Sequence, residues 1–164
     1  MLFFSTYSLL TFGQDSTKTE KSFRIIPLVT SSPLMGLGAG LAVSYLYKTD
    51  STNSSKSQLQ VGGQYSNTNS YNTFLKNNAW FKNNDFFSTT VIIQSSINNE
   101  FYSDEEDVAY NINSLLMSEN LMFRVAPKIY SGALISYQRV YYNANNIAGE
   151  DFINKNGIQN ETTG

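Results

Sequence analysis

Hydrophobic and polar residues alternate with a period of two along most of this chain, which is the pattern of β-strands with two different faces. The clearest stretch runs from Gly36 to Lys48. One set of alternate positions there is apolar or aromatic, and the other begins with Gly36, Gly38 and Gly40. Glycine weakens a strand that packs on a soluble core, whereas in a transmembrane barrel the apolar face meets lipid and a small face leaves room inside. The pattern therefore favours an antiparallel transmembrane β-barrel.

The same alternation recurs in six other segments, so the sequence predicts about seven strands. They cover residues 23–30, 36–48, 57–66, 70–82, 85–96, 109–126 and 129–142. Tight turns are expected at 67–69, 83–84 and 127–128, and long polar loops at 98–107 and from Asn143 onward. Short turns and longer loops alternate in outer-membrane barrels, and the connection at 49–56 fits this alternation poorly.

Individual side chains follow from the faces of these strands. The residues expected to face lipid are Leu37, Ala39, Leu41, Val43, Leu59 and Val61. Aromatic residues gather where a barrel wall crosses the membrane surface, and Tyr45, Tyr47 and Tyr137 are expected to form such an interface girdle. Glu119 interrupts the apolar positions of 109–126, and we expect a bulge or a place near the membrane surface to accommodate it.

The start of the chain is typical of an exported protein. An apolar run from Leu2 to Phe12 has the length of the hydrophobic region of a signal peptide and is too short to cross a bilayer as a helix. We therefore expect a signal peptide at 1–13, a polar lead at 14–22 and the barrel segment at 23–164. No later stretch is apolar over the length that a transmembrane helix requires.

Composition excludes most catalytic chemistry. The 164 residues include no His and no Cys, so catalytic triads and zinc or haem sites that need these residues lack their parts. A net charge of −2 argues against a nucleic-acid partner. The acidic run at 100–107 lacks the spacing of a calcium loop and is expected to be solvated, and 36–40 lacks the Lys of a phosphate loop. We expect no enzyme activity, no cofactor and no metal.

The segment FRIIPLVTSSPLMGLGAGLAVSYLYKTD, followed by GGQYSNTNS and WFKNNDFF, resembles the opening barrel strands of the Omp85 superfamily. These are the bacterial surface antigen barrels of the BamA and TamA type, particularly those of Bacteroidetes. The shared pattern is a first strand with Pro27, an S-P-x-x-G turn at 32–36, a second strand with alternating glycine, and an aromatic-Lys-Asn-Asn turn at 81–84. The resemblance covers roughly residues 22–142.

This resemblance implies a sixteen-stranded barrel in the outer membrane of a Gram-negative cell. Its role would be to insert other outer-membrane proteins or to translocate polypeptides, so the implied partners are outer-membrane lipid and unfolded outer-membrane proteins or exported polypeptides. Sixteen strands need well over twice the present length. The R-G-[YF] motif and the final aromatic strand of the later barrel half are absent. We therefore expect the chain to be the N-terminal part of a barrel.

Pro27 is the residue for which the sequence suggests the most specific functional role. In the Omp85 superfamily the first strand borders the seam where the barrel closes on its last strand. Proline cannot donate a hydrogen bond to a sheet ladder, so Pro27 is expected to limit pairing of the first strand and to ease opening of the seam. An incidental bulge at this position is the alternative.

Two other architectures stay open at this point. The first is a small eight-stranded pore or adhesin that closes by itself, although residues 143–164 lack the apolar alternation of a closing strand. The second is an exported soluble β-sandwich that binds a ligand, in which the same apolar faces would form a core.

Overall fold

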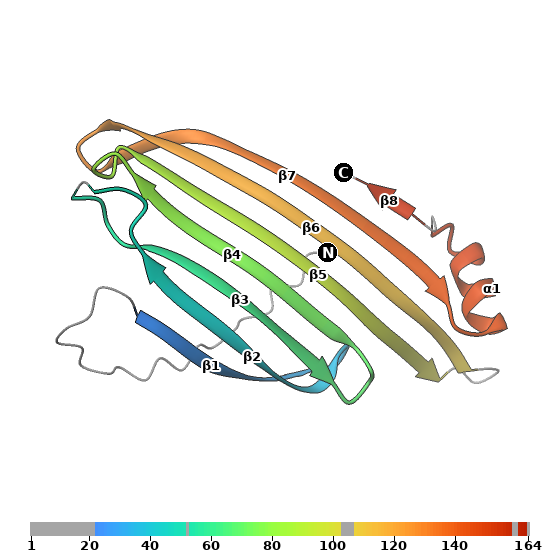
Figure 1. Ribbon diagram of the computed structural model, residues 1–164. Coiled ribbons are helices and arrows are strands. Elements are labelled where there is room, and N and C mark those ends of the chain that lie inside the picture. The colour runs from blue at the N-terminus through green and yellow to red at the C-terminus, as the bar shows by residue number, and fades with distance from the viewer. Residues whose placement is uncertain (1–21, 52, 103–106, 159–160, 164) are drawn as a thin grey trace.

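The computed structural model describes residues 22–51, 53–102, 107–158 and 161–163, and these form one antiparallel sheet with a single short helix (Figure 1). Strand order in the sheet follows chain order. The strands are β1 (Ser22–Ser32), β2 (Gly36–Tyr47), β3 (Ser57–Ser66), β4 (Tyr71–Phe81), β5 (Phe86–Tyr102), β6 (Asp107–Ala126), β7 (Ile129–Ala144) and the three-residue β8 (Glu161–Thr163). The prediction of an all-β fold with about seven antiparallel strands is confirmed.

The prediction of a long polar loop at 98–107 is wrong. Strands β5 and β6 stay paired as far as Tyr102 and Asp107, and residues 103–106 lie outside the described part of the chain. Amide side chains replace apolar ones in this part of the hairpin: the Asn111 Nδ2 donates to Asn98 Oδ1 at 2.7 Å, and Asn99 Nδ2 donates to the Tyr110 hydroxyl at 2.6 Å. Cross-strand hydrogen bonds stabilise pairing that hydrophobic alternation does not reveal.

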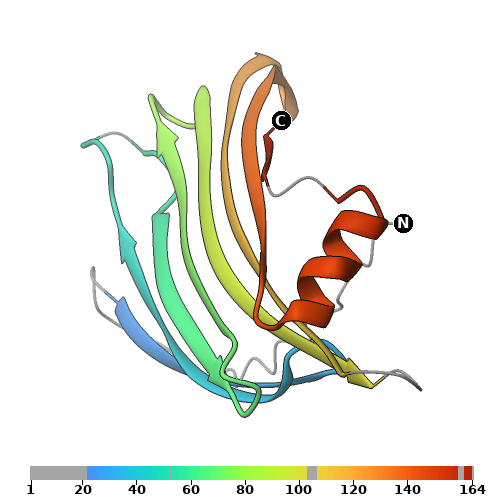
Figure 2. The same ribbon diagram turned by 90° about the vertical axis from the view of Figure 1, so that its right-hand side faces the viewer.

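The segment from Asn143 onward is also more ordered than predicted, because it contains α1 (Ile147–Lys155). The side chain of Asn146 caps this helix by accepting a hydrogen bond from the Gly149 backbone N–H at 2.7 Å. The ring of Phe152 stacks on Tyr110 of β6 with 5.7 Å between centroids. Helix α1 therefore packs against the ends of β6 and β7 (Figure 2).

The sheet is strongly curved (Figure 2), which makes its two faces unequal. Side chains on the concave face of a curved sheet converge and cover one another. In β2, Gly38, Ala42 and Ser44 are buried, whereas Leu37 and Leu41 on the opposite face are 61% and 59% exposed. The small residues of β2 therefore lie on the concave face, and strand pairing extends this assignment across the sheet.

The sheet is open at both edges among the described residues. Strand β1 pairs only with β2, and β7 pairs with β6 and, over three residues, with β8. Neither a closed eight-stranded barrel nor a second sheet packed on the first is present in this part of the chain. Within the described residues, no helix has both the length and the apolar character that crossing a membrane requires.

The close approach of β2 and β3 depends on Gly40. A Cβ at this position would overlap the carbonyl oxygen of Gly63 and lie 2.6 Å from the Gln64 Cα. We expect Gly40→Ala to lower the free energy of unfolding by about 1–3 kcal/mol through this overlap. Denaturant unfolding followed by the fluorescence of Trp80, the single tryptophan, measures the loss.

Ala39→Val is the matched control, because Ala39 is exposed on the convex face of the same strand. It should change the free energy of unfolding by no more than about 0.5 kcal/mol. Equal losses in the two variants would show that the pairing does not depend on this contact.

Candidate functional site

The convex face is the candidate functional surface, because it gathers exposed apolar side chains. All large hydrophobic side chains that are exposed on the described strands lie on it, with the exception of Leu134. They are Phe23, Ile25, Val29, Leu37, Leu41, Val61, Tyr65, Tyr71, Met117, Phe123, Val125, Ile129, Ile135 and Tyr137. None of them is on β5, whose convex face has the polar residues Ser88, Thr90 and Gln94. Exposed apolar patches such as those on either side of β5 mark a contact with lipid or with another protein.

The six residues that the sequence predicts to face lipid all lie on this convex face, in β2 and β3. Their register brings them together, since Val43 pairs with Val61 and Tyr45 pairs with Leu59. Leu37, Ala39, Leu41 and Val61 are exposed, and Val43 and Leu59 are half-buried.

The apolar stretches of β2 and β6 on the convex face define a band that runs obliquely to the strands, and Ser88, Thr90 and Gln94 interrupt it on β5. Leu41 lies in the middle of the apolar stretch Leu37–Tyr45 on β2, and its row of paired residues reaches β6 at Leu115. Leu115 is the first residue, not the middle, of the apolar stretch Leu115–Val125. The middle has therefore moved by about five residues, or about 16 Å, across four strand spacings of about 19 Å in total. The band is inclined by about 40° to the hydrogen-bonded rows.

The predicted tyrosine girdle is divided between the two borders of this band. Tyr45 and Tyr47 stack with 6.0 Å between centroids at the end of β2. Tyr137 is on the same face but lies opposite Met117, at the other end of the apolar positions of β7 and next to Arg139. The structure thus brings two of the three residues together and places the third apart from them.

Sequence reasoning missed a second aromatic cluster on the convex face. Phe86 contacts both Phe81 and Phe123, with 5.6 Å between the ring centroids of each pair. The motif WFKNNDFF contained the signal, because Phe81 and Phe86 flank one tight connection and must pair across it. The cluster lies at the same ends of the strands as Tyr45 and Tyr47.

The polar side chains within the band bond to one another. The Glu119 carboxylate accepts from the hydroxyls of Ser88 at 2.5 Å and Thr90 at 2.6 Å, both on β5. The hydroxyl of Tyr47 donates to Asn77 Oδ1 at 2.7 Å. The sequence led us to expect either a bulge near Glu119 or a place near the membrane surface. The pairing at Glu119 is regular, so no bulge is present there, and the register shifts instead between Arg124 and Ala126. Hydrogen bonds, not a bulge, accommodate this glutamate.

Pro27 lies on the convex face of β1, the edge strand, opposite Leu41. Pairing between β1 and β2 runs without a shift from Ser22 to Ser32. A bulge at Pro27, the alternative considered above, is therefore not present, and an edge strand is where a sheet tolerates proline.

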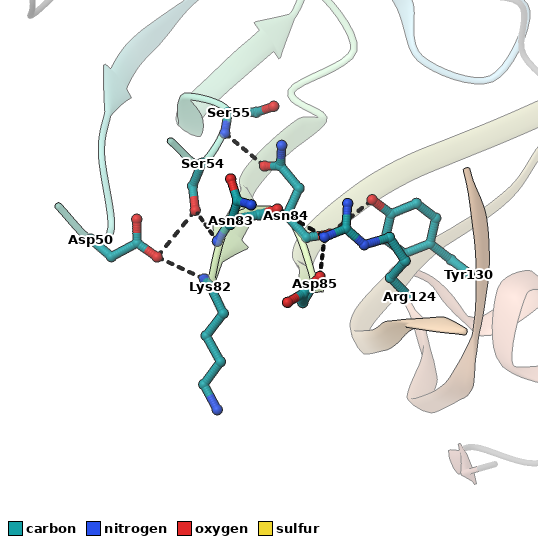
Figure 3. A network of polar contacts seen from close by, with 9 residues as sticks. All are labelled: Asp50, Ser54, Ser55, Lys82, Asn83, Asn84, Asp85, Arg124 and Tyr130. Carbon is teal, nitrogen blue, oxygen red and sulfur yellow. Dashed lines mark hydrogen bonds and ion pairs between the residues drawn. The ribbon is translucent and has the colours of Figure 1, made fainter. Parts of the chain in front are cut away.

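A polar network braces the strand ends next to the aromatic cluster (Figure 3). Its centre is the connection between β4 and β5, where Lys82, Asn83 and Asn84 have positive φ angles of 50°, 57° and 66°. Such angles are costly for residues other than glycine, although asparagine tolerates them. Three consecutive residues in this conformation need support from their surroundings.

Support for this connection comes from two sides. From the connection between β2 and β3, Asp50 Oδ2 accepts from the Lys82 backbone N–H at 2.7 Å, and Ser54 Oγ accepts from that of Asn83 at 2.9 Å. From β6 and β7, Arg124 pairs with Asp85 and the Tyr130 hydroxyl donates to the Asn84 carbonyl at 2.9 Å. The 49–56 connection that fitted the turn pattern poorly is thus docked on its neighbour.

The structure supports neither of two other candidate sites from the sequence, the acidic run at 100–107 and the glycine-rich residues 36–40. Of the acidic run at 100–107, the structure places Glu100 on β5 and Asp107 on β6, and the other acidic residues lie outside the described part. The described residues bring together no group of three or more His, Cys, Asp or Glu side chains suited to a metal. Residues 36–40 are part of a strand, which does not form a phosphate-binding turn.

Comparison with models of protein families, with curated protein sequences and with solved structures finds no match to this chain.

The hydrogen bonds of Glu119 can be tested by removing their acceptor. Glu119→Ala leaves the Ser88 and Thr90 hydroxyls without this partner, and we expect a loss of about 2 kcal/mol in the free energy of unfolding. Glu100→Ala is the matched control, since Glu100 is an exposed acid on the same face. Trp80 fluorescence in denaturant measures both, and equal losses would rule out a specific role for Glu119.

Proposed function

We propose that this sheet is part of the wall of an outer-membrane β-barrel. Its convex face contacts lipid and its concave face lines a water-filled interior. The oblique apolar band carries the proposal, because strands of transmembrane barrels are tilted by 35–45° from the membrane normal. The hydrogen-bonded rows are perpendicular to the strands, so they are inclined to the membrane plane by the tilt of the strands. A band at about 40° to these rows is therefore parallel to the membrane plane when the strands have that tilt.

The width of the band supports the same proposal. The stretch Leu37–Tyr45 is about 26 Å long along its strand, which corresponds to about 20 Å of membrane depth at a tilt of 40°. With the flanking aromatic residues, this approaches the apolar height of about 25 Å in outer-membrane barrels. Along the strands, the apolar band is followed by the aromatic cluster and then by the polar network. This is the order expected from the apolar interior of a membrane through its interface to water.

The resemblance in sequence favours a barrel of the Omp85 type among outer-membrane barrels. The proposed role is assembly of other outer-membrane proteins or translocation of polypeptides, with unfolded outer-membrane proteins or exported polypeptides as partners. The absence of His and Cys from the sequence supports a wall without catalytic function. A lipid-exposed sheet edge is not tolerated inside a bilayer, so the proposal requires further strands on β1 and β7.

Single cysteines test which face meets lipid, because the chain has no cysteine of its own. In membranes from expressing cells, we expect Val61→Cys on the convex face to resist a water-soluble maleimide. Its neighbour Gln60→Cys, on the concave face of the same strand, should react at least tenfold faster. Equal reaction at both positions would contradict the membrane proposal and favour a soluble protein.

The seam hypothesis gives a second test. In a full-length barrel, Pro27→Val restores one backbone N–H to the edge strand β1, and we expect it to increase disulfide crosslinking between β1 and the closing strand by several fold. Val29→Ile, a substitution at an exposed position of the same strand face, is the control. Unchanged seam crosslinking in Pro27→Val would refute a role for this proline in opening.

A further inference from the structure

The net charges of the two sheet faces differ in sign, because the convex face of β1 to β7 has Glu100, Asp107 and Glu119 against the single cation Arg139. On the concave face, the charged residues of the described strands are Arg24, Lys76 and Arg124, and no carboxylate is among them. Arg124 is neutralised by Asp85. Arg24 and Lys76 are exposed and have no ion-pair partner among the described residues. The concave face therefore has positive charge although the whole chain is acidic.

Arg24 and Lys76 stand at the two ends of one row of paired residues. The row crosses four strands in the order Arg24, Ser44, Gln60, Lys76. Three strand spacings place the backbones of the two cations about 14 Å apart. Uncharged hydrogen-bonding side chains lie between and beside them on the same face: Ser44, Gln58, Gln60, Gln64, Asn72 and Asn78.

We propose that this row binds an acidic segment of an extended polypeptide. An extended chain covers about 14 Å in four residues, and side chains four residues apart project from the same side of it. Two carboxylates at that spacing reach Arg24 and Lys76 together. The amide side chains between them offer both donors and acceptors to the peptide backbone. This inference deepens the proposed function and rests on it for the entry of polypeptide to the concave face.

The two acidic residues of α1 do not cancel these two cations. Glu150 and Asp151 of α1 lie at the far ends of β6 and β7 (Figure 2). The row of Arg24 and Lys76 crosses β7 at Ser136, more than about 20 Å along the strand from Ala144. At physiological salt this distance exceeds two screening lengths.

Gln60→Cys places a reporter thiol within the row, next to Lys76. In membranes, its rates with an anionic and a cationic methanethiosulfonate are compared after normalisation to a free thiol. One positive charge within about 10 Å in water changes the ratio by about threefold. We therefore expect a ratio of at least three, which falls towards one in Arg24→Gln/Lys76→Gln. Ser136→Cys is the control on the same row and should give a ratio near one.

Peptides of identical composition test the ligand. SESSSES has its carboxylates four residues apart, and SEESSSS has them adjacent. We expect the spaced peptide to slow labelling of Gln60→Cys by an uncharged reagent at about a third of the concentration that the adjacent one requires. Equal protection, no protection, or an unaltered rate ratio in the double variant would overturn the inference.

Failure of this inference and failure of the proposed function give different results. If the protein is soluble, Val61→Cys reacts with an uncharged reagent as fast as Gln60→Cys does, whatever the ratio of the anionic and cationic rates at Gln60→Cys. If the concave face does not attract acidic chains, Val61→Cys stays protected while the ratio at Gln60→Cys is one.

Discussion

Backbone hydrogen bonding within a single layer is the constraint on which the rest of this structure depends. Seven long strands bond to their neighbours, yet no second layer covers the convex face in the described residues. Among all the described residues, the buried hydrophobic ones are only Ala42, Ala79, Val108 and Ile153. A domain normally buries its apolar surface between two layers. Here the apolar side chains of the convex face remain exposed. The stability of the sheet therefore depends on what surrounds that face.

The composition of each face follows from this arrangement. Small residues on the concave face of β2 allow the sheet to curve, and Gly62 leaves room for the ring of Phe74, which would lie 2.8 Å from a Cβ there. The charged residues of β1 to β7 on the convex face are Glu100, Asp107, Glu119 and Arg139, and the Glu119 carboxylate already accepts two hydroxyl hydrogen bonds. Polar groups that bond to one another cost less in an apolar medium than unpaired ones.

Hydrophobic alternation predicted the strands because each of them has two unlike faces. It located β3 at its observed ends, Ser57 and Ser66, and it placed Leu37 to Val43 on one face. It failed where hydrogen bonds replace hydrophobicity, as in the asparagine pairs that extend β5 and β6. It also could not find the band, because the inclination depends on the register between strands. Tyr137 illustrates this, since its position along the sheet relative to Tyr45 follows from the pairing of the strands and not from the sequence of its own segment.

The inclined band is tested most directly by depth measurement in a membrane. Fluorophores on single cysteines at Leu41, Leu115 and Leu121 are quenched by lipids brominated at different depths. With strands tilted by about 40°, Leu41 and Leu121 lie within about 3 Å of the same depth, although they are in different rows of the sheet. Leu115, in the row of Leu41, lies about 12 Å in depth from Leu41 and about 15 Å from Leu121. Equal depths for Leu41 and Leu115, or no quenching at any position, would contradict the account.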